Sequence, residues 1–285
     1  MTEVADTTIR ERRRTPSDVA QVMTVARYDI YKHLRSKRLY GILAIAAILI
    51  IVNLVLPPAL GEDYSDDPAD FASGFIGFMP TFIIIVATLF AGDAIVSEFQ
   101  GRTGYLLFPN PVKRWSLYVG KVAAALGLGV VLVAIYYAIV AMLTFVFTGG
   151  STVLLVWSML LAFIYMAATI SLGFMISSFM KGSTGALILT FALLFLIMPM
   201  VAGILSLTEL KPDFLLTFQA DSTVYILDDP YPQDYSDTFD VGTGSPMTIW
   251  YYYPQPWTAA AVMLAYAVVS AVAGYLSFSK REMVS

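Results

Sequence analysis

The apolar positions of this chain gather into six long runs, each separated from the next by a polar or glycine-containing stretch. A run of about eighteen or more apolar residues is long enough for an α-helix to cross the ~30 Å hydrocarbon core of a bilayer. The pattern therefore predicts an all-α membrane protein with six transmembrane helices. The predicted spans are residues 39–57, 75–97, 115–147, 153–179, 184–207 and 257–278.

The residues before the first span divide into two parts. Residues 1–14 are polar and rich in arginine, and we expect them to form a disordered basic tail. Residues 15–38 predict an amphipathic interfacial helix, because Thr15 and Pro16 are a typical N-cap and first-turn pair and apolar side chains follow at spacings of three and four. We expect this helix to lie on the inner membrane surface and to help seat a partner, the alternative being a simple topology anchor. Its apolar positions are Val19, Val22, Met23, Ala26, Ile30 and Leu34.

Positive charge is distributed very unevenly along the chain. Sixteen of the seventeen lysines and arginines lie before span one, between spans two and three, between spans four and five, or after span six, and Lys211 is the exception. The positive-inside rule therefore places both termini in the cytoplasm. Residues 39–285 then form a six-span transmembrane domain in which residues 208–256 are an extracellular segment. This segment is acidic but rich in aromatic residues, and we expect short helices that rest on the outer end of the bundle.

The composition matters mainly for the classes of protein that it excludes. The chain is 58% hydrophobic and 13% charged, so an ordinary soluble core is excluded. It has no cysteine and a single histidine, His33, which argues against disulfides, thiolate metal sites and multi-histidine metal clusters. It lacks the phosphate-binding loop, the serine-hydrolase elbow and the zinc-protease motif. We predict that the chain is not an enzyme, binds no metal or cofactor of its own and has no nucleic-acid partner.

One acidic residue falls inside a predicted span. Asp93 lies near the predicted cytoplasmic end of span two, about one turn before Glu98. An ionisable side chain in a membrane span is a candidate functional group. The alternative is that Asp93 is solvated at the interface, or pairs with Arg102 or Lys121. The middle of each span is otherwise almost devoid of charge, which favours an energy source supplied by a separate protein.

The stretch between spans two and three brings charge, glycine, proline and aromatic residues together in order. It reads EFQGRTGYLLFPNPVKRWSLYVGK from Glu98 to Lys121. We interpret residues 98–114 as the cytoplasmic coupling region, through which a membrane subunit contacts a separate motor protein.

This stretch resembles the second-to-third-span signature of ABC-2 type permeases, the membrane subunits of ABC transporters with the type V fold. Two details depart from the usual pattern: Arg102 stands between Gly101 and Thr103, and residues 108–111 read Phe-Pro-Asn-Pro. The basic amphipathic helix, the six spans and the large segment before span six extend the resemblance over nearly the whole chain. The residues that carry it are Glu98, Phe99, Gln100, Gly101, Arg102, Thr103, Leu106, Leu107, Pro109, Pro111, Val112, Lys113, Arg114, Gly120 and Lys121.

The resemblance implies a half-transporter. The chain would pair with a second copy of itself or with a homologous permease, and ABC ATPase subunits that bind ATP and Mg²⁺ would dock below. The coupling region would lie in a groove of the ATPase, with apolar side chains in a cleft and basic side chains at acidic rims. The implied coupling residues are Glu98, Gly101, Arg102, Thr103, Tyr105, Leu106, Leu107, Phe108, Pro109, Lys113 and Arg114.

We therefore predict a multi-pass permease subunit of the cell membrane that exports a hydrophobic or amphipathic substrate. Tyr136, Tyr137 and Phe145 are candidate liners of the substrate path, although packing explains them equally well. Two alternatives remain open at this point. One is a non-transporting membrane scaffold or sensor coupled to an ATPase, and the other is an ion-coupled carrier that uses Asp93.

Overall fold

The structure is a computed structural model, and it describes residues 17–100, 113–240 and 246–280. Within these residues, six helical segments are long and apolar enough to cross a membrane, in agreement with the six predicted spans and the all-α membrane class. Four segments are single helices: α2 (Lys37–Ala59), α7 (Arg114–Thr148), α8 (Leu154–Phe179) and α13 (Pro256–Lys280). The second segment, Pro68–Gln100, consists of α3 (Pro68–Ile76), α4 (Met79–Ala91) and α5 (Val96–Gln100). The fifth segment, Ser183–Leu205, consists of α9 (Ser183–Ala192), the π-helical turn η1 (Leu193–Ile197) and α10 (Met198–Leu205).

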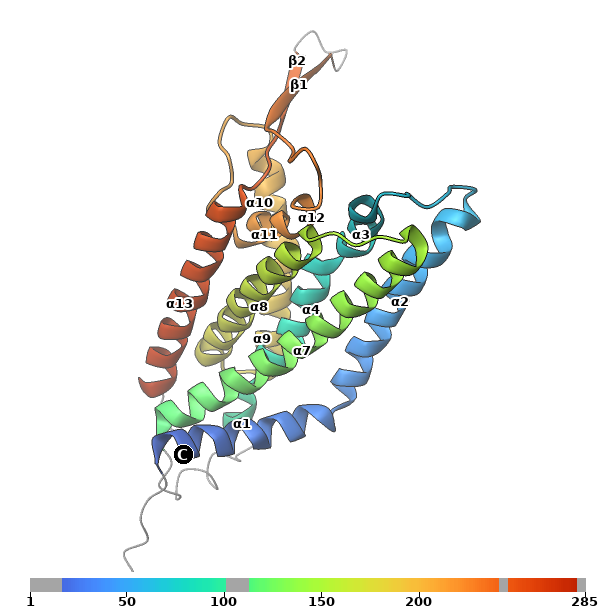
Figure 1. Cartoon of the computed structure of the whole chain (residues 1–285). Coiled ribbons are helices and arrows are strands. Elements are labelled where there is room, and N and C mark those ends of the chain that lie inside the picture. The colour runs from blue at the N-terminus through green and yellow to red at the C-terminus, as the bar shows by residue number, and fades with distance from the viewer. Residues whose placement is uncertain (1–16, 101–112, 241–245, 281–285) are drawn as a thin grey trace, which may run out of the picture.

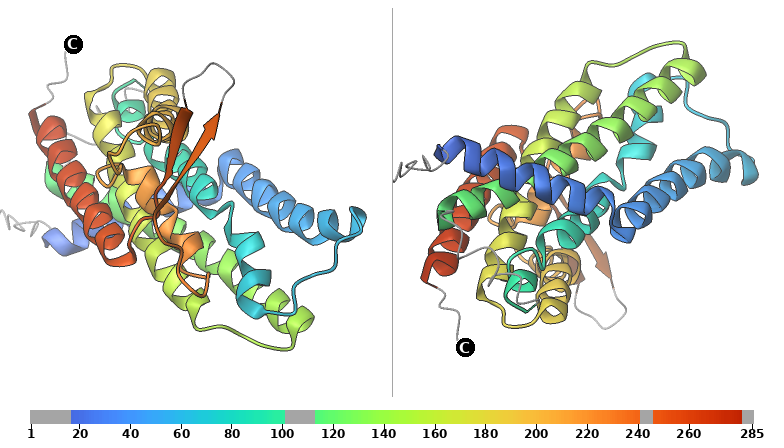
Figure 2. Two further views of the ribbon diagram at one scale, coloured as in Figure 1. Left: turned by 90° about the horizontal axis from the view of Figure 1, so that it is seen from above. Right: turned by 90° about the horizontal axis from the view of Figure 1, so that it is seen from below.

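Helix α8 occupies the centre of the bundle (Figure 1). It packs against α13, α4 and α7, and it is the most buried of the six segments. Small residues allow the closest of these approaches: a Cβ at Gly173 of α8 would lie 2.9 Å from the Cβ of Ala91 on α4. Helix α2 is the opposite case, because only 6% of its apolar window is buried. It leans away from the other helices, as Figures 1 and 2 show.

Helix α1 (Asp18–Leu34) lies across one end of the bundle, which we call the α1 end (Figure 2). Its N-cap is Ser17, whose hydroxyl accepts a hydrogen bond from the amide of Ala20 at 3.3 Å. The predicted cap, Thr15, lies outside the described residues. The helix ends at Leu34, and Ser36 caps the start of α2. The predicted helix over 15–38 is therefore a shorter helix followed by a sharp turn into the first span.

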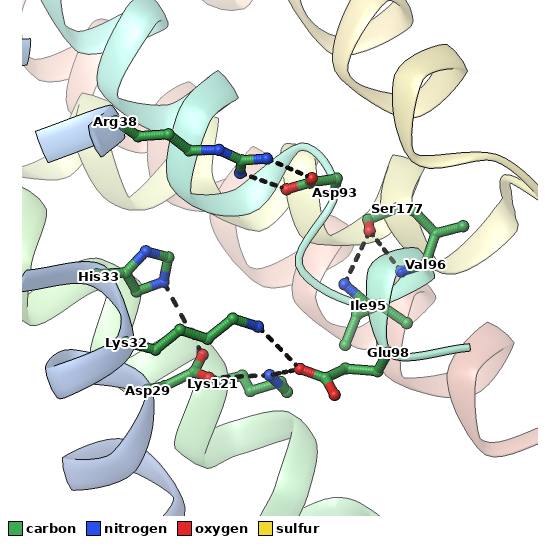
Figure 3. Close-up of polar contacts among 10 residues, drawn as sticks. All are labelled: Asp29, Lys32, His33, Arg38, Asp93, Ile95, Val96, Glu98, Lys121 and Ser177. Carbon is green, nitrogen blue, oxygen red and sulfur yellow. Dashed lines mark hydrogen bonds and ion pairs between the residues drawn. The ribbon is translucent and has the colours of Figure 1, made fainter. Parts of the chain in front are cut away.

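The second span is interrupted near the α1 end. Helix α4 ends at Ala91, and the chain turns over Gly92 to Ile95 before α5 begins. The hydroxyl of Ser177 on α8 accepts hydrogen bonds from the amides of Ile95 at 2.9 Å and Val96 at 3.1 Å (Figure 3). These bonds satisfy backbone groups that the broken helix leaves without an intrahelical partner. The interruption sets the directions of two acidic residues, Asp93 within the turn and Glu98 in the helix that follows it.

The opposite end of the bundle carries residues 206–255. Two short helices, α11 (Leu216–Ala220) and α12 (Ser222–Tyr225), rest on the bundle, as expected from the sequence. The expectation of helices throughout is wrong for the rest: β1 (Tyr235–Asp240) and β2 (Pro246–Tyr251) form an antiparallel hairpin that projects from the bundle (Figure 1). Aromatic and β-branched side chains on both strands favour this pairing, and the rings of Tyr235 and Tyr251 stack with centroids 4.6 Å apart.

The aromatic residues proposed to line a substrate path have different environments. Tyr136 and Tyr137 are both 2% exposed. The hydroxyl of Tyr136 donates to the carbonyl of Phe75 at 2.9 Å, and the hydroxyls of Tyr137 and Ser158 lie 2.7 Å apart. Phe145 is exposed on the outside of α7. Packing within the chain therefore accounts for the two tyrosines.

Candidate functional site

The face that α1 turns toward the bundle is polar. Gln21, Asp29 and His33 are buried beneath the helix, together with Ala26. The apolar positions Val19, Met23 and Leu34 are exposed instead. Tyr28 and Tyr31 are exposed as well. Polar contacts therefore contribute to the attachment of α1 to the bundle, beside the packing of Val25 and Ala26.

Helix α1 lies very close to α7. A Cβ at Gly120 would lie 2.8 Å from the Cβ of Val25 and 2.9 Å from the carbonyl oxygen of Val22. Real Cβ atoms do not approach a backbone oxygen so closely, so glycine is required for this crossing. The close approach allows Lys121, the next residue of α7, to reach the buried face of α1.

Four charged residues meet at this crossing, and we call them the Lys121 cluster: Asp29, Lys32, Glu98 and Lys121. The Nζ atom of Lys121 lies 3.0 Å from Oδ1 of Asp29 and 2.9 Å from Oε1 of Glu98 (Figure 3). Lys32 approaches the same Oε1 atom at 3.1 Å. Two lysines thus balance two carboxylates, which joins α1, α5 and α7.

Burial makes this arrangement demanding. The side chain of Lys121 is 4% exposed and that of Asp29 is 8% exposed. Buried charges are tolerated only when they are paired and hydrogen-bonded, and removal of one partner leaves the other uncompensated.

His33 lies one turn after Asp29, with Nε2 4.0 Å from a carboxylate oxygen of Asp29 and its ring against Phe90. Burial lowers the pKa of His33 more than the carboxylate raises it, so its imidazole stays neutral near neutral pH.

A second set of contacts lies at the start of α1. The backbone amide of Lys113 donates to Oε1 of Gln21 at 3.0 Å, and its Nζ atom lies 2.8 Å from the carboxylate of Asp18. The guanidinium of Arg114 donates to the carbonyl of Ser279 at 2.6 Å, near the end of α13. The residues that immediately follow the 101–112 segment are thus held by α1 and α13.

Both flanks of the 101–112 segment are therefore attached to the same helix. Glu98, on the N-terminal side of the segment, pairs with Lys32 near the end of α1. Lys113, on the C-terminal side, pairs with Asp18 at the start of α1. Gln100 makes a further contact, because its side-chain oxygen accepts from the amide of Ser183 at 2.9 Å. Helix α1 acts as a brace between the described residues on the two sides of the segment.

Asp93 takes part in a separate ion pair. Its carboxylate receives two hydrogen bonds from the guanidinium of Arg38, at 2.7 and 2.8 Å, and the same guanidinium donates to the carbonyl of Leu89 at 2.9 Å (Figure 3). The alternative pairing of Asp93 with Lys121 is wrong, because Arg38, at the start of α2, makes the bidentate pair and Lys121 is held by Asp29 and Glu98. The other alternative partner, Arg102, lies outside the described residues. This pair fastens the first span to the second.

Of the proposed coupling residues, the structure places Glu98, Lys113 and Arg114 at the α1 end, on the flanks of one segment. The remaining ones lie outside the described residues: Gly101, Arg102, Thr103, Tyr105, Leu106, Leu107, Phe108 and Pro109. Sequence reasoning missed the partners Asp29, Arg38 and Ser177. A signal for Asp29 was present, because Asp29 and His33 are four residues apart on a helix and so share a face.

Comparison with known families gives a match to one family model, described as "ABC-2 family transporter protein", over residues 23–283. The match includes most of α1, all six spans and the hairpin end of the bundle. A comparison with curated proteins returned no match. The matched region covers well over half of the chain, and it contains the Lys121 cluster and the Arg38–Asp93 pair. This chain therefore belongs to the ABC-2 family of transporter proteins: it is a permease subunit of an ABC transporter, and this subunit is a membrane transport component that is not itself catalytic.

Proposed function

We propose that this permease is the membrane half of an ABC exporter and that residues 98–114 dock a separate ATPase subunit. The observation that carries the proposal is the attachment of both flanks of the 101–112 segment to α1, through Glu98–Lys32 at 3.1 Å and Lys113–Asp18 at 2.8 Å. A loop that must transmit force needs fixed ends, and these contacts supply them.

The Lys121 cluster would transmit the motion of the ATPase to the membrane. Because Lys121 of α7 pairs with both Asp29 of α1 and Glu98 of α5, a push on the loop displaces three helices together. Buried, fully paired polar networks are rigid and have one favoured arrangement. We expect ATP binding by the partner to tilt α5 and α7 with α1 as one body.

The remaining parts of the proposal concern the orientation in the membrane, the partners and the cargo. The α1 end and both termini face the cytoplasm, where the ATPase binds ATP and Mg²⁺. The exposed apolar side chains of α1, such as Val19 and Met23, would enter the lipid headgroup layer. A second copy or a homologous permease completes the transporter in the cell membrane. The cargo is hydrophobic or amphipathic, consistent with the scarcity of charge within the spans.

The contacts of Asp93 weigh against the ion-coupled carrier. The bidentate pair with Arg38 accounts for the burial of this carboxylate without any transported ion. A scaffold or sensor would use the same ATPase contact, and it differs from an exporter only in moving no solute. Vectorial transport by the reconstituted complex separates those two functions.

The test is co-purification of the chain with candidate ABC ATPase subunits. The wild type is compared with the double variant Arg102→Glu plus Leu107→Asp in the proposed docking segment. Lys181→Glu is the matched control, because Lys181 is an exposed residue in the loop between α8 and α9, beside Gly182 and Ser183, which contact Gln100. We expect capture by the wild type and the control, and loss of capture in the double variant. Equal capture of all three chains, with the membrane bundle folded, would overturn the assignment of the docking region.

A further inference from the structure

A cavity of about 370 Å³ lies at the end of the bundle opposite α1. It is lined by the start of α4, the middle of α8, η1 and α10, helix α11, and Asp221 between α11 and α12. Most of its wall is apolar and includes Ile84, Phe195, Pro199 and Phe218. The π-helical turn that supplies Phe195 is a local irregularity of a kind that occurs frequently at functional sites.

Besides Thr81, three oxygen-bearing side chains line this cavity. The hydroxyl of Tyr165 is fully buried, and the hydroxyl of Thr217 is also inaccessible. Neither hydroxyl has a hydrogen-bond partner within residues 17–100, 113–240 and 246–280. The third group is the carboxyl of Asp221, which stands at the N-cap position of α12 without capping that helix. Buried polar groups are nearly always hydrogen-bonded, so a set of unsatisfied oxygens around one cavity indicates a missing ligand.

The charge of Asp221 is also uncompensated. No lysine, arginine or protonated histidine of the described residues acts on this carboxyl, and burial raises its pKa to about 7. The titratable groups that do face Asp221 are the phenols of Tyr165, Tyr225 and Tyr231, which are neutral near neutral pH. A carboxyl in an apolar cavity is costly to ionise unless a cation accompanies it.

The wall next to Asp221 continues into an aromatic surface. A second cavity, of about 210 Å³, shares Ala202 and Phe218 with the first and is lined by Tyr225, Trp250 and the tyrosines at 251–253. Aromatic faces attract organic cations, and apolar walls accept their hydrocarbon parts. The two cavities together offer a carboxyl, hydroxyl acceptors and aromatic rings, which is the chemistry that recognises an ammonium group on an apolar body.

We propose that the cavity around Asp221 binds an organic ammonium ion with an aromatic or aliphatic body. The ammonium would pair with the Asp221 carboxylate and donate to the hydroxyl oxygens of Tyr165 and Thr217, while the body packs against Phe195 and Phe218. This inference rests on the proposed export function in one respect: if the chain is an exporter, the bound cationic amphiphile represents its class of cargo. The binding itself requires no ATPase.

The experiment uses the full-length chain in nanodiscs without any ATPase, with empty nanodiscs as the blank. Isothermal titration compares phenylethylammonium with phenylethanol, which has nearly the same shape and no charge. Asp221→Asn keeps the size of the side chain and removes its charge. The matched control is Asp237→Asn, which removes an acidic side chain from the exposed hairpin of the same segment.

We expect the ammonium ion to bind wild type and Asp237→Asn equally, and Asp221→Asn roughly 10- to 100-fold more weakly, as for loss of a charge-assisted hydrogen bond. As the pH is raised toward neutrality, the affinity for the ammonium ion should increase by up to about tenfold per pH unit, because Asp221 loses its proton. Above neutrality the affinity should level off. Equal affinity for phenylethanol and phenylethylammonium in the wild type would overturn the proposal without reference to any variant. Unchanged ammonium binding in Asp221→Asn would overturn it as well. Failure of ATPase capture, in contrast, would remove only the export function and leave this binding result standing.

Discussion

At the scale of single residues, Asp221 is a carboxyl whose surroundings disfavour its charged form. Its carboxyl lies among apolar walls, and the raised pKa means that the folded chain retains a proton that the unfolded chain releases. Between a pH of about 3.8 and about 7, the folded state therefore binds more protons than the unfolded state. Stability is highest below this window and is lost as the pH rises through it.

Asp221→Asn should remove this pH dependence. Above neutral pH, we expect the variant to be more stable than the wild type by roughly 2–4 kcal/mol, because it has no charge to bury. Near the lower limit of the window, the two chains should have equal stability. Thermal unfolding of the detergent-solubilised chain at several pH values measures the difference. A stability difference that does not change with pH would contradict the burial of an ionisable carboxyl at this position.

The residue scale is also where prediction from sequence was weakest. Asp93 was correctly singled out as an ionisable group in a span, but its partner, Arg38, is 55 positions away. The sequence offered Arg102 and Lys121 as nearer candidates. The packing of α2 beside α4 is what brings Arg38 to Asp93, and the sequence does not show this packing. Likewise, Ser177 is one of many small residues in α8, and its role depends on the break in span two that it stabilises.

At the scale of elements, α1 is the helix that organises the α1 end. The sequence predicted an amphipathic helix here, and the exposed apolar side chains agree with a position at the membrane surface. It did not predict that the other face would be buried and charged. Long hydrophobic runs predict spans well because a helix of that length and composition matches the thickness of the hydrocarbon core. The break in span two, the π turn and the hairpin depend on neighbouring elements, so sequence periodicity did not reveal them.

Substitution of Lys121 by methionine tests the brace directly. Lys121→Met keeps the length of the side chain and leaves Asp29 and Glu98 without their shared buried cation. We expect a loss of roughly 3–5 kcal/mol in the free energy of unfolding, the range for breaking a buried ion pair. Unfolding of the purified chain in mixed micelles provides the measurement.

Lys32→Met is the matched control for this substitution. Lys32 contacts the same Glu98 oxygen atom, but its side chain is 52% exposed. An exposed pair contributes about 0–1 kcal/mol, so the control should be nearly as stable as the wild type. Equal losses in the two variants would show that burial at the Lys121 cluster does not determine the strength of the brace.

At the scale of the whole molecule, the two ends of the bundle differ in kind. The α1 end gathers the paired basic residues other than Lys211, whereas the opposite end carries short helices, the acidic segment and the hairpin. Six spans explain why the described chain begins and ends at the same end of the bundle. The positive-inside rule predicts that this end faces the cytoplasm.

This orientation can be tested with single thiols, because the chain contains no cysteine. Thr24→Cys places a thiol on the exposed side of α1, and Ser236→Cys places one on the exposed hairpin. With a membrane-impermeant maleimide, we expect Ser236→Cys to react in intact cells and Thr24→Cys to react only after permeabilisation. Reaction of Thr24→Cys in intact cells would place the α1 end outside and remove the ATPase from its reach.

The central claim is that residues 98–114 meet an ABC ATPase at the α1 end, and site-specific cross-linking tests it most directly. Leu107→Cys carries the only thiol of the chain, and a photoreactive maleimide attached there samples the immediate surroundings of the docking segment. The account predicts a covalent adduct between position 107 and the ATPase subunit, and none from the same reagent at Ser236→Cys. No adduct at position 107 in a complex that retains its ATPase, or equal adducts at both positions, would contradict it.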